Sequence, residues 1–185
     1  MMKTFLTAFL AAVGLAEAAT EIAPYEVLRQ DGAFEVRQYP QLVLVETDGS
    51  QNEMNNNFRR LFRYISGSNQ AEQKIPMTAP VFTEGREEGG KMAFVMPVGM
   101  PEEKTPRPAD SSLAVREQAA GRFAVYRFSG WTSVKGEKEA AAKLDEWVRA
   151  NGLEKKGEVI FAYYDPPCTL PMFRRNEAMV LLADQ

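Results

Sequence analysis

The sequence has no histidine and a single cysteine, Cys168, among its 185 residues. Without histidine the chain cannot build a Ser-His-Asp or Cys-His catalytic site, or any metal site that depends on an imidazole ligand. One cysteine excludes an intrachain disulfide framework and a metal cluster built from several thiolates. Catalytic and metal sites built on histidine or on several cysteines are therefore unavailable to this chain.

An excess of positive charge is also lacking. Lysine and arginine total 22 against 25 acidic residues, which gives a net charge of -3. The basic residues are scattered, so a groove for nucleic acid is not expected. Apolar residues make up 45% and charged residues 25% of the chain, which are ordinary values for a globular domain. We therefore expect one folded domain rather than a disordered or fibrous chain.

The first 18 residues have the pattern of an export signal. Lys3 precedes an apolar run over 5–15, and Ala16-Glu17-Ala18 provides the small residues expected before a cut at Ala19. The run is shorter than the roughly 20 apolar residues that a spanning helix needs. We therefore predict a signal peptide over 1–18 and a single domain over 19–185. The mature protein is expected to be periplasmic or secreted, without a membrane span.

A short pattern occurs twice in the remaining chain. The segment 32–39 alternates apolar and polar residues, as a half-buried strand does, and the segment 121–128 repeats its Gly-x-Phe-x-Val-x-x-aromatic order 89 positions later. This repeat predicts a duplicated structure in which Phe34 matches Phe123 and Val36 matches Val125.

Each copy precedes a stretch with helical spacing. The first expected helix begins after a candidate capping box of Ser50 and Glu53, and Gly67 is suited to end it. The second helix is expected to end at Gly152. The apolar stripes contain Met54, Phe58, Leu61, Phe62 and Ile65 in the first helix, and Ala140, Ala141, Leu144, Trp147 and Val148 in the second.

Two strand pairs follow the helices, over 74–82 with 92–97 and over 159–167 with 178–182. Pro76 and Pro80 predict that the first of these strands is an edge or bulged strand. The order strand-strand-helix-strand-strand, repeated, predicts an α+β fold with a pseudo-two-fold axis and mostly antiparallel pairing. The halves should cover about 24–98 and 113–185, with 99–112 as the connector.

Several blocks resemble the SOUL haem-binding protein family. The most specific is Met77-Thr78-Ala79-Pro80-Val81, which follows the turn Gly67-x-Asn69. Weaker matches are Tyr39-Pro40, 92–97, and Tyr164-Asp165-Pro166-Pro167 with Asn176-Glu177. Together they cover nearly all of the predicted mature chain in the order of the family.

The resemblance implies a distorted antiparallel β-barrel of two repeats with two main helices, like bacterial effector-binding domains. It also implies that haem or another tetrapyrrole binds in a cleft between 54–64 and 170–175. Apolar side chains would contact the ring and arginines would orient its propionates. The candidate cofactor-binding residues are Met54, Arg59, Arg60, Arg63, Tyr64, Leu170, Met172, Phe173 and Arg174.

Simpler structural roles stay open for these residues. Leu170 and Phe173 could pack under their own loop as a satellite cluster, and the arginines of the first helix could form a solvated face near its C-terminus. Met54, Tyr64, Met77, Cys168 and Met172 are the remaining candidates for an iron ligand, although binding without an axial ligand fits this sequence better. We expect Cys168 to be a small, partly buried residue.

The sequence therefore predicts an exported, monomeric carrier or buffer for a tetrapyrrole, and not an enzyme. Two alternatives remain. One is a broad-specificity binder of bulky hydrophobic compounds, which acidic residues buried in the cleft would favour. The other is a hydrolase acting on such compounds, which needs a deeply buried carboxylate with a raised pKa.

Overall fold

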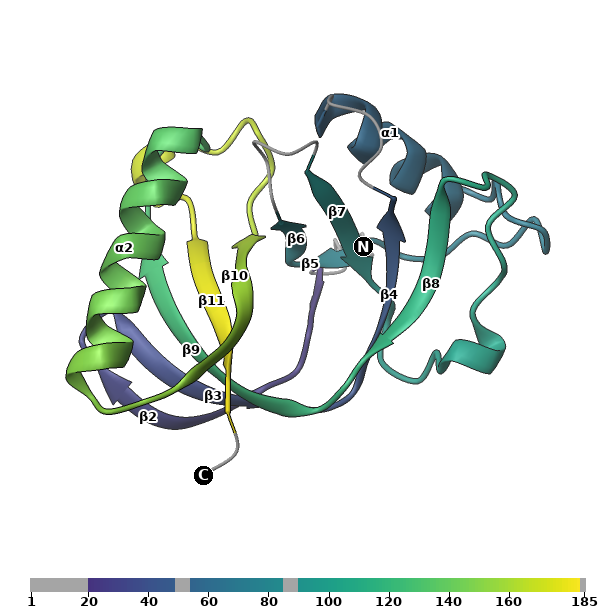
Figure 1. Ribbon diagram of the computed structural model, residues 1–185. Coiled ribbons are helices and arrows are strands. Elements are labelled where there is room, and N and C mark those ends of the chain that lie inside the picture. The colour runs from purple at the N-terminus through teal and green to yellow at the C-terminus, as the bar shows by residue number, and fades with distance from the viewer. Residues whose placement is uncertain (1–19, 49–53, 85–89, 184–185) are drawn as a thin grey trace, which may run out of the picture.

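A computed structural model describes residues 20–48, 54–84 and 90–183 (Figure 1). Two α-helices, α1 (Met54–Ile65) and α2 (Val134–Ala150), accompany eleven strands and two short 3-10 helices in this part of the chain. The strands are β1 (Glu21–Ile22), β2 (Glu26–Asp31), β3 (Phe34–Tyr39), β4 (Leu42–Thr47), β5 (Thr78–Ala79), β6 (Val81–Glu84), β7 (Lys91–Val95), β8 (Leu113–Gln118), β9 (Gly121–Phe128), β10 (Lys155–Tyr163) and β11 (Asn176–Leu182), and the 3-10 helices are η2 (Glu102–Lys104) and η3 (Pro171–Phe173).

Nine strands form one curved antiparallel sheet in the order β2-β3-β9-β11-β10-β6-β7-β4-β8, and β1 pairs with β5 separately in parallel. The helices lie at opposite ends of this sheet, α2 over β9, β10 and β11 and α1 over β4 and β7 (Figure 1). The predicted α+β class with two main helices is confirmed. The sheet stays open between its edge strands β2 and β8, so the barrel implied by the resemblance is not closed.

The two halves repeat the predicted order as β3-β4-α1-β6-β7 and β8-β9-α2-β10-β11. In both halves the strand before the helix pairs with the last strand of that half, β4 with β7 and β9 with β11. The counterpart of β9 is therefore β4. The predicted match of Phe34 with Phe123 and Val36 with Val125 is wrong, because β3 and β9 are neighbours that pair with each other, Phe34 opposite Tyr126.

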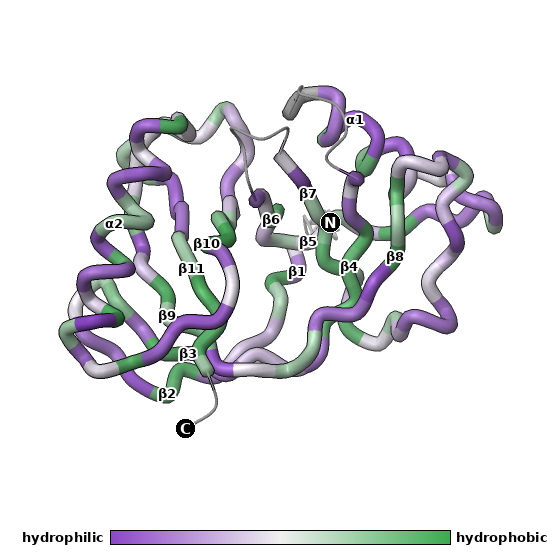
Figure 2. Tube along the Cα trace, in the orientation of Figure 1, coloured by the Kyte–Doolittle hydropathy of each residue, from purple (hydrophilic) through white to green (hydrophobic). Residues whose placement is uncertain are grey.

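Three apolar clusters form the core. One lies beneath α2 and contains Leu144 and Trp147, and another lies beneath α1 and contains Leu61 and Phe94. A third joins the halves through strands β3, β4, β7, β9 and β11. Figure 2 shows that hydrophobic residues concentrate on β4 and β7, whereas α1 above them is largely hydrophilic. Helix α1 therefore covers the core with few of its side chains.

The helix boundaries follow local sequence signals. Ser133 caps α2 by accepting a hydrogen bond from the backbone N–H of Gly136 at 3.1 Å. Gly67 and Gly152 follow the two helices with positive φ values of 112° and 65°, which glycine adopts without strain, as predicted. The proposed capping box of Ser50 and Glu53 lies outside the described residues.

Pro80 divides the predicted strand 74–82 into β5 and β6. Pro76 and Pro80 predict an edge or bulged strand here. The strand is interrupted at Pro80, and β5 pairs with β1 in the separate two-stranded sheet, but β6 is not at the edge, because it pairs with β10 on one side and β7 on the other. The predicted export signal lies outside the described residues. Within residues 20–48, 54–84 and 90–183, no helix combines the length and apolar character needed to cross a membrane.

Candidate functional site

An exposed pair of aromatic rings marks the surface of α1. Phe58 and Phe62 are one helical turn apart, and their rings stack with centroids 6.0 Å apart and planes inclined by 13°. They are 40% and 49% exposed, whereas the sequence periodicity placed both in the buried stripe. Phe58 is fixed from below by an edge contact with Phe94 at 5.4 Å. The outer surface of α1 thus presents an exposed pair of near-parallel aromatic rings, called the aromatic platform below.

Cations border this platform. Arg59 and Arg63 directly follow the two phenylalanines in sequence and are both exposed. The third predicted arginine, Arg60, points elsewhere, because its side chain is 12% exposed and its Nε lies 3.7 Å from Oδ2 of Asp110. The Nη1 atom of Arg60 is buried without a hydrogen-bond partner. Arg59 and Arg63 are therefore the predicted arginines that remain exposed on α1. Hydrogen bonds from Ser112 lower the pKa of Asp110 most, and the positive charges of Arg60 and Arg63 lower it further, so Arg63 also lies close to this carboxylate.

Tyr64 is not available to a ligand. Its side chain is buried, and its hydroxyl donates a hydrogen bond to the carbonyl oxygen of Pro106 at 2.7 Å. Burial raises the pKa of Tyr64 to about 12, so the phenolate that would ligate iron is disfavoured. The structure gives Tyr64 a role in attaching the connector to α1. The side chain of Met54 lies outside the described part of the structure.

The predicted loop before β11 also exposes apolar side chains. Leu170, Met172 and Phe173 are 58%, 66% and 71% exposed, so they do not form a satellite core under the loop. Arg174 is buried and holds the loop in place by donating to the carbonyl oxygens of Thr169 and Pro167 at 2.8 and 2.5 Å. Its guanidinium carbon also lies 4.7 Å from the ring centroid of Trp131, so Arg174 is a structural clamp.

The candidate ligand residues on α1 and those in the loop 170–175 lie on the same side of the molecule but do not form one cluster. The loop follows β10 and α1 covers β7 and β4, and β6 lies between β10 and β7 in the sheet (Figure 1). The apolar part of the loop lies beside the segment after β9, because the carbonyl oxygen of Pro171 accepts a hydrogen bond from Gly130 N–H at 2.9 Å. Strands β9 and β7 are four positions apart in the sheet, and neighbouring strands are about 4.8 Å apart, so roughly 19 Å separate these two strands. Only a broad ligand could contact the platform on α1 and the loop together.

The remaining sulfur ligand candidates differ in exposure. Cys168 is exposed, which corrects the expectation that it is partly buried. It lies in the same loop as the exposed Met172. Met77 is half-buried, and Met92 and Met96 are core residues, as their strand spacing indicated. No group of three or more cysteine and acidic side chains within the described residues could hold a metal ion.

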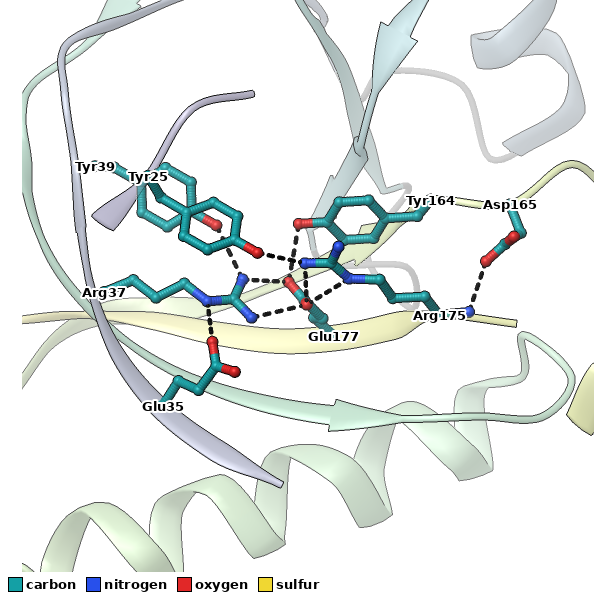
Figure 3. A network of polar contacts seen from close by, with 8 residues as sticks. All are labelled: Tyr25, Glu35, Arg37, Tyr39, Tyr164, Asp165, Arg175 and Glu177. Carbon is teal, nitrogen blue, oxygen red and sulfur yellow. Dashed lines mark hydrogen bonds and ion pairs between the residues drawn. The ribbon is translucent and has the colours of Figure 1, made fainter. Parts of the chain in front are cut away.

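A buried polar network lies where the two halves meet, around Glu177 of β11 (Figure 3). Its carboxylate accepts two hydrogen bonds from Arg37, at 2.7 and 2.9 Å, and others at 2.9 Å from Arg175 and from the hydroxyl of Tyr164. Tyr25 packs its ring 4.2 Å from the Arg37 guanidinium and accepts a hydrogen bond from Arg175 at 2.9 Å.

The two arginines determine the protonation of this network. Burial alone would raise the pKa of Glu177, but the hydrogen bonds and positive charge of Arg37 and Arg175 hold it below its usual range. Burial, with the adjacent negative charge of Glu177, raises the pKa of Tyr164 above its usual range. Glu177 is thus an ionised, neutralised carboxylate. It does not have the raised pKa that the hydrolase alternative required.

Sequence reasoning missed the exposed aromatic pair and the network. The i,i+4 spacing of Phe58 and Phe62 was visible, but spacing identifies one face of a helix and not its exposure. Arg37 and Glu177 are separated by 140 positions, and no local pattern connects them. The block Asn176-Glu177 was noted only as part of a family match.

Known proteins resemble this chain in sequence and in fold. "Heme-binding protein 2" of Homo sapiens is 28% identical over 170 residues, which cover 86% of this chain and 82% of that protein. A structure described as a hydrolase from Listeria innocua superimposes with a TM-score of 0.57 at 12% identity, covering 84% of this chain and 94% of its own. The EcmrR C-terminal domain gives 0.55 at 14% identity, covering 87% and 99%.

At these identities the two structures support the fold alone. The family model of the SOUL heme-binding proteins matches residues 20–181, which is nearly the whole described chain. This extent, together with the predicted motifs in their order along β3 to β11, shows that the protein belongs to the SOUL heme-binding protein family.

Proposed function

We propose that this protein binds haem or a related tetrapyrrole and serves as an exported carrier or buffer for it. Membership of the SOUL family is the observation that carries this proposal. The exposed aromatic platform of Phe58 and Phe62 supports it, because exposed aromatic rings can pack against a macrocycle. Titration of the protein with haemin, followed by the Soret band, is the experiment that tests it.

In the proposed complex the ring lies on Phe58 and Phe62, and Leu170, Met172 and Phe173 contact its far part. These apolar side chains are exposed, so burying them against the ring is the main source of affinity. Arg59 and Arg63 orient the propionates. Exposed charge pairs contribute only about 0–1 kcal/mol each, so the arginines select the orientation more than they set the affinity.

The residues fit a tetrapyrrole held without an axial protein ligand. The bound iron would supply redox and ligand-exchange chemistry, but the chain contains no histidine, and Tyr64 is buried and hydrogen-bonded. Of the sulfur atoms near the proposed surface, Met172 and Cys168 are exposed. The chain's own contribution is to bind and orient the ring and to shield one face of it from water.

Replacing Met172 with Ala tests this mode of binding. We expect the Soret position of the haemin complex to stay almost unchanged and to indicate high-spin or weakly ligated iron, because the thioether is not a ligand. Absorption spectra of the haemin complexes of the wild type and Met172→Ala show whether the thioether ligates the iron. Cys168→Ala is the matched control for the loss of a sulfur atom. A low-spin spectrum that becomes high-spin in Met172→Ala contradicts the proposal.

The charges beside the platform on α1 favour a tetrapyrrole over a hydrophobic cation, for which a buried acidic group in the same cleft would be expected. Glu137 is buried in α2, at the other end of the sheet, and accepts a hydrogen bond from the hydroxyl of Tyr163. Glu177, the acidic side chain at the junction of the halves, is fully buried and bound to Arg37 and Arg175. The accessible charges beside the aromatic platform are instead arginines, which match the anionic propionates of haem.

Export is part of the proposal and has its own test. The pattern of Lys3, the apolar run 5–15 and Ala16-x-Ala18 leads us to expect a mature N-terminus at Ala19 or Thr20. Intact mass spectrometry of protein isolated from a periplasmic or secreted fraction measures this directly. A chain that retains Met1 and is found in the cytosol contradicts the localisation, while leaving ligand binding to be judged separately.

A further inference from the structure

A groove in the C-terminal half is not used by the proposed function. It has a volume of about 370 Å³ and lies between α2 and the end of β9. Its principal lining residues are three aromatic side chains, two small residues and a lysine: Tyr126, Phe128, Trp131, Gly136, Ala140 and Lys143. Neither the aromatic pair on α1 nor the apolar residues of the loop 170–173 line this groove.

Tyr126, Phe128 and Trp131 form one side of the groove, called the aromatic wall below. Tyr126 and Phe128 are the last members of a row of stacked rings. Trp147 stacks on Phe34 with centroids 5.2 Å apart and planes inclined by 3°, and Phe34 stacks on Tyr126 at 4.7 Å and 25°. Tyr126 in turn stacks on Phe128 at 6.0 Å and 16°. Trp131 follows beyond this row and is 69% exposed. A further planar ring can stack in the groove against side chains that are already ordered.

The opposite wall leaves the groove open. Gly136 and Ala140 are one turn apart on α2 and place no large side chain in the groove, while Glu139 and Lys143 of the same helix line it with charged side chains. A Cβ atom at position 136 would lie 3.2 Å from Oγ of Ser133, the residue that caps the helix. The glycine therefore preserves both the capped helix end and the low wall of the groove.

The charges at the groove favour an anion. Lys143 Nζ lies 5.7 Å from the ring centroid of Tyr126 and 3.5 Å from its hydroxyl, so an ammonium group stands over the aromatic wall. The acidic residue that lines the groove is Glu139, whose carboxylate lies 3.9 Å from Nζ of Lys135. A ligand carboxylate or sulfonate can reach Lys143 while its ring stacks on Phe128 and Trp131.

We propose that this groove is a second ligand site, specific for a planar aromatic molecule that carries one anionic group. The ring stacks on the aromatic wall and the anion pairs with Lys143. The groove is distinct from the aromatic pair on α1, since the two lie beside different helices and use different aromatic residues. It adjoins the loop 170–173, because Arg174 of that loop segment lies 4.7 Å from the ring centroid of Trp131.

Tryptophan fluorescence can test this site because the chain has only two tryptophans. Trp147 is buried and Trp131 is exposed at the groove. We expect 8-anilinonaphthalene-1-sulfonate, added to haem-free protein, to quench Trp131 in a saturable way. Lys143→Gln should raise its dissociation constant up to about fivefold. Phe128→Ala should raise it up to roughly tenfold.

Three controls separate the possible outcomes. Lys104→Gln removes an equal charge from the exposed η2 helix and should leave the dissociation constant unchanged. Trp131→Phe should abolish the quenching. Haemin affinity should be the same in Lys143→Gln as in the wild type, which keeps this test distinct from that of the proposed function. Equal binding of 2-naphthalenemethanol, or equal quenching in wild type, Lys143→Gln and Phe128→Ala, would overturn the proposed site.

Discussion

Replacing Glu177 with Gln is expected to lower the free energy of unfolding by about 3–5 kcal/mol, the largest effect that we predict for stability. The substitution keeps the shape of the side chain but removes the charge that neutralises Arg37 and Arg175. Arg175 would then lack its carboxylate partner, and Arg37 would keep Glu35, whose carboxylate accepts a hydrogen bond from Arg37 Nε at 2.6 Å. The amide NH2 of Gln would also face a guanidinium donor where the carboxylate oxygen had accepted a hydrogen bond. Urea unfolding at pH 7, followed by tryptophan fluorescence, measures the change.

An exposed ion pair provides the matched control. Asp145 accepts hydrogen bonds from Lys155 at 2.8 and 3.0 Å, and the two side chains are 34% and 44% exposed. Asp145→Asn should therefore cost no more than about 1 kcal/mol. Equal losses in Asp145→Asn and Glu177→Gln would show that the buried network contributes no more than a surface pair.

The pH dependence of stability gives the same network a second test. Because the folded-state pKa of Glu177 is lowered, its stabilising contribution is present above the usual glutamate pKa of about 4.3 and is lost as the pH falls through the lower folded-state value. The stability difference between wild type and Glu177→Gln should therefore shrink as the solution is acidified below about pH 4. A difference that grows on acidification contradicts this assignment.

Truncating the proposed ring contacts should produce the largest loss of ligand affinity. Phe173→Ala removes an aromatic side chain of the type that contributes on the order of 1–3 kcal/mol when buried, so haemin affinity should fall roughly fivefold to hundredfold. Phe62→Ala should have a comparable effect, because its exposed ring forms half of the platform on α1. Dissociation constants from haemin titrations measure both losses.

Two further variants make this prediction specific. Val98→Ala removes an apolar side chain that is 69% exposed in the turn after β7, and it should leave haemin affinity unchanged. Arg60→Ala should have a smaller effect than either phenylalanine variant, because Arg60 is directed toward Asp110. Normal affinity in Phe173→Ala would remove the loop 170–175 from the site, and normal affinity in Phe62→Ala would remove the platform.

Local sequence patterns predicted the elements better than their relations. The strand expected over 121–128 has those bounds as β9, and the second helix buries Ala140, Leu144, Trp147 and Val148 as its spacing indicated. The duplication was also visible as an order of elements. Its alignment was wrong because alternation with a period of two occurs in any half-buried strand, so β3 and β9 matched in pattern without being equivalent.

Exposure and long-range pairing were not accessible to the same reasoning. Phe58 and Phe62 share a face of α1 with buried residues, but whether a strand or loop covers that part of the face depends on the whole fold. The ion pair between Arg37 and Glu177 joins β3 to β11, and it forms only when β9 brings these strands to either side of itself. The predicted ligand residues Tyr64 and Arg174 instead donate hydrogen bonds to the backbone, Tyr64 to Pro106 and Arg174 to Thr169. These contacts depend on how the loops fold back, which no local pattern of the sequence indicates.

Haemin titration of the chain from Ala19 to Gln185 is the most direct test of the central claim, that this protein binds a tetrapyrrole by ring burial without histidine ligation. We expect saturable binding with a high-spin or weakly ligated Soret spectrum in the wild type. We also expect weaker binding with the same spectrum in Phe62→Ala. The absence of a saturable Soret change in the wild type would contradict the claim, as would a low-spin complex whose affinity is unaffected by Phe62→Ala.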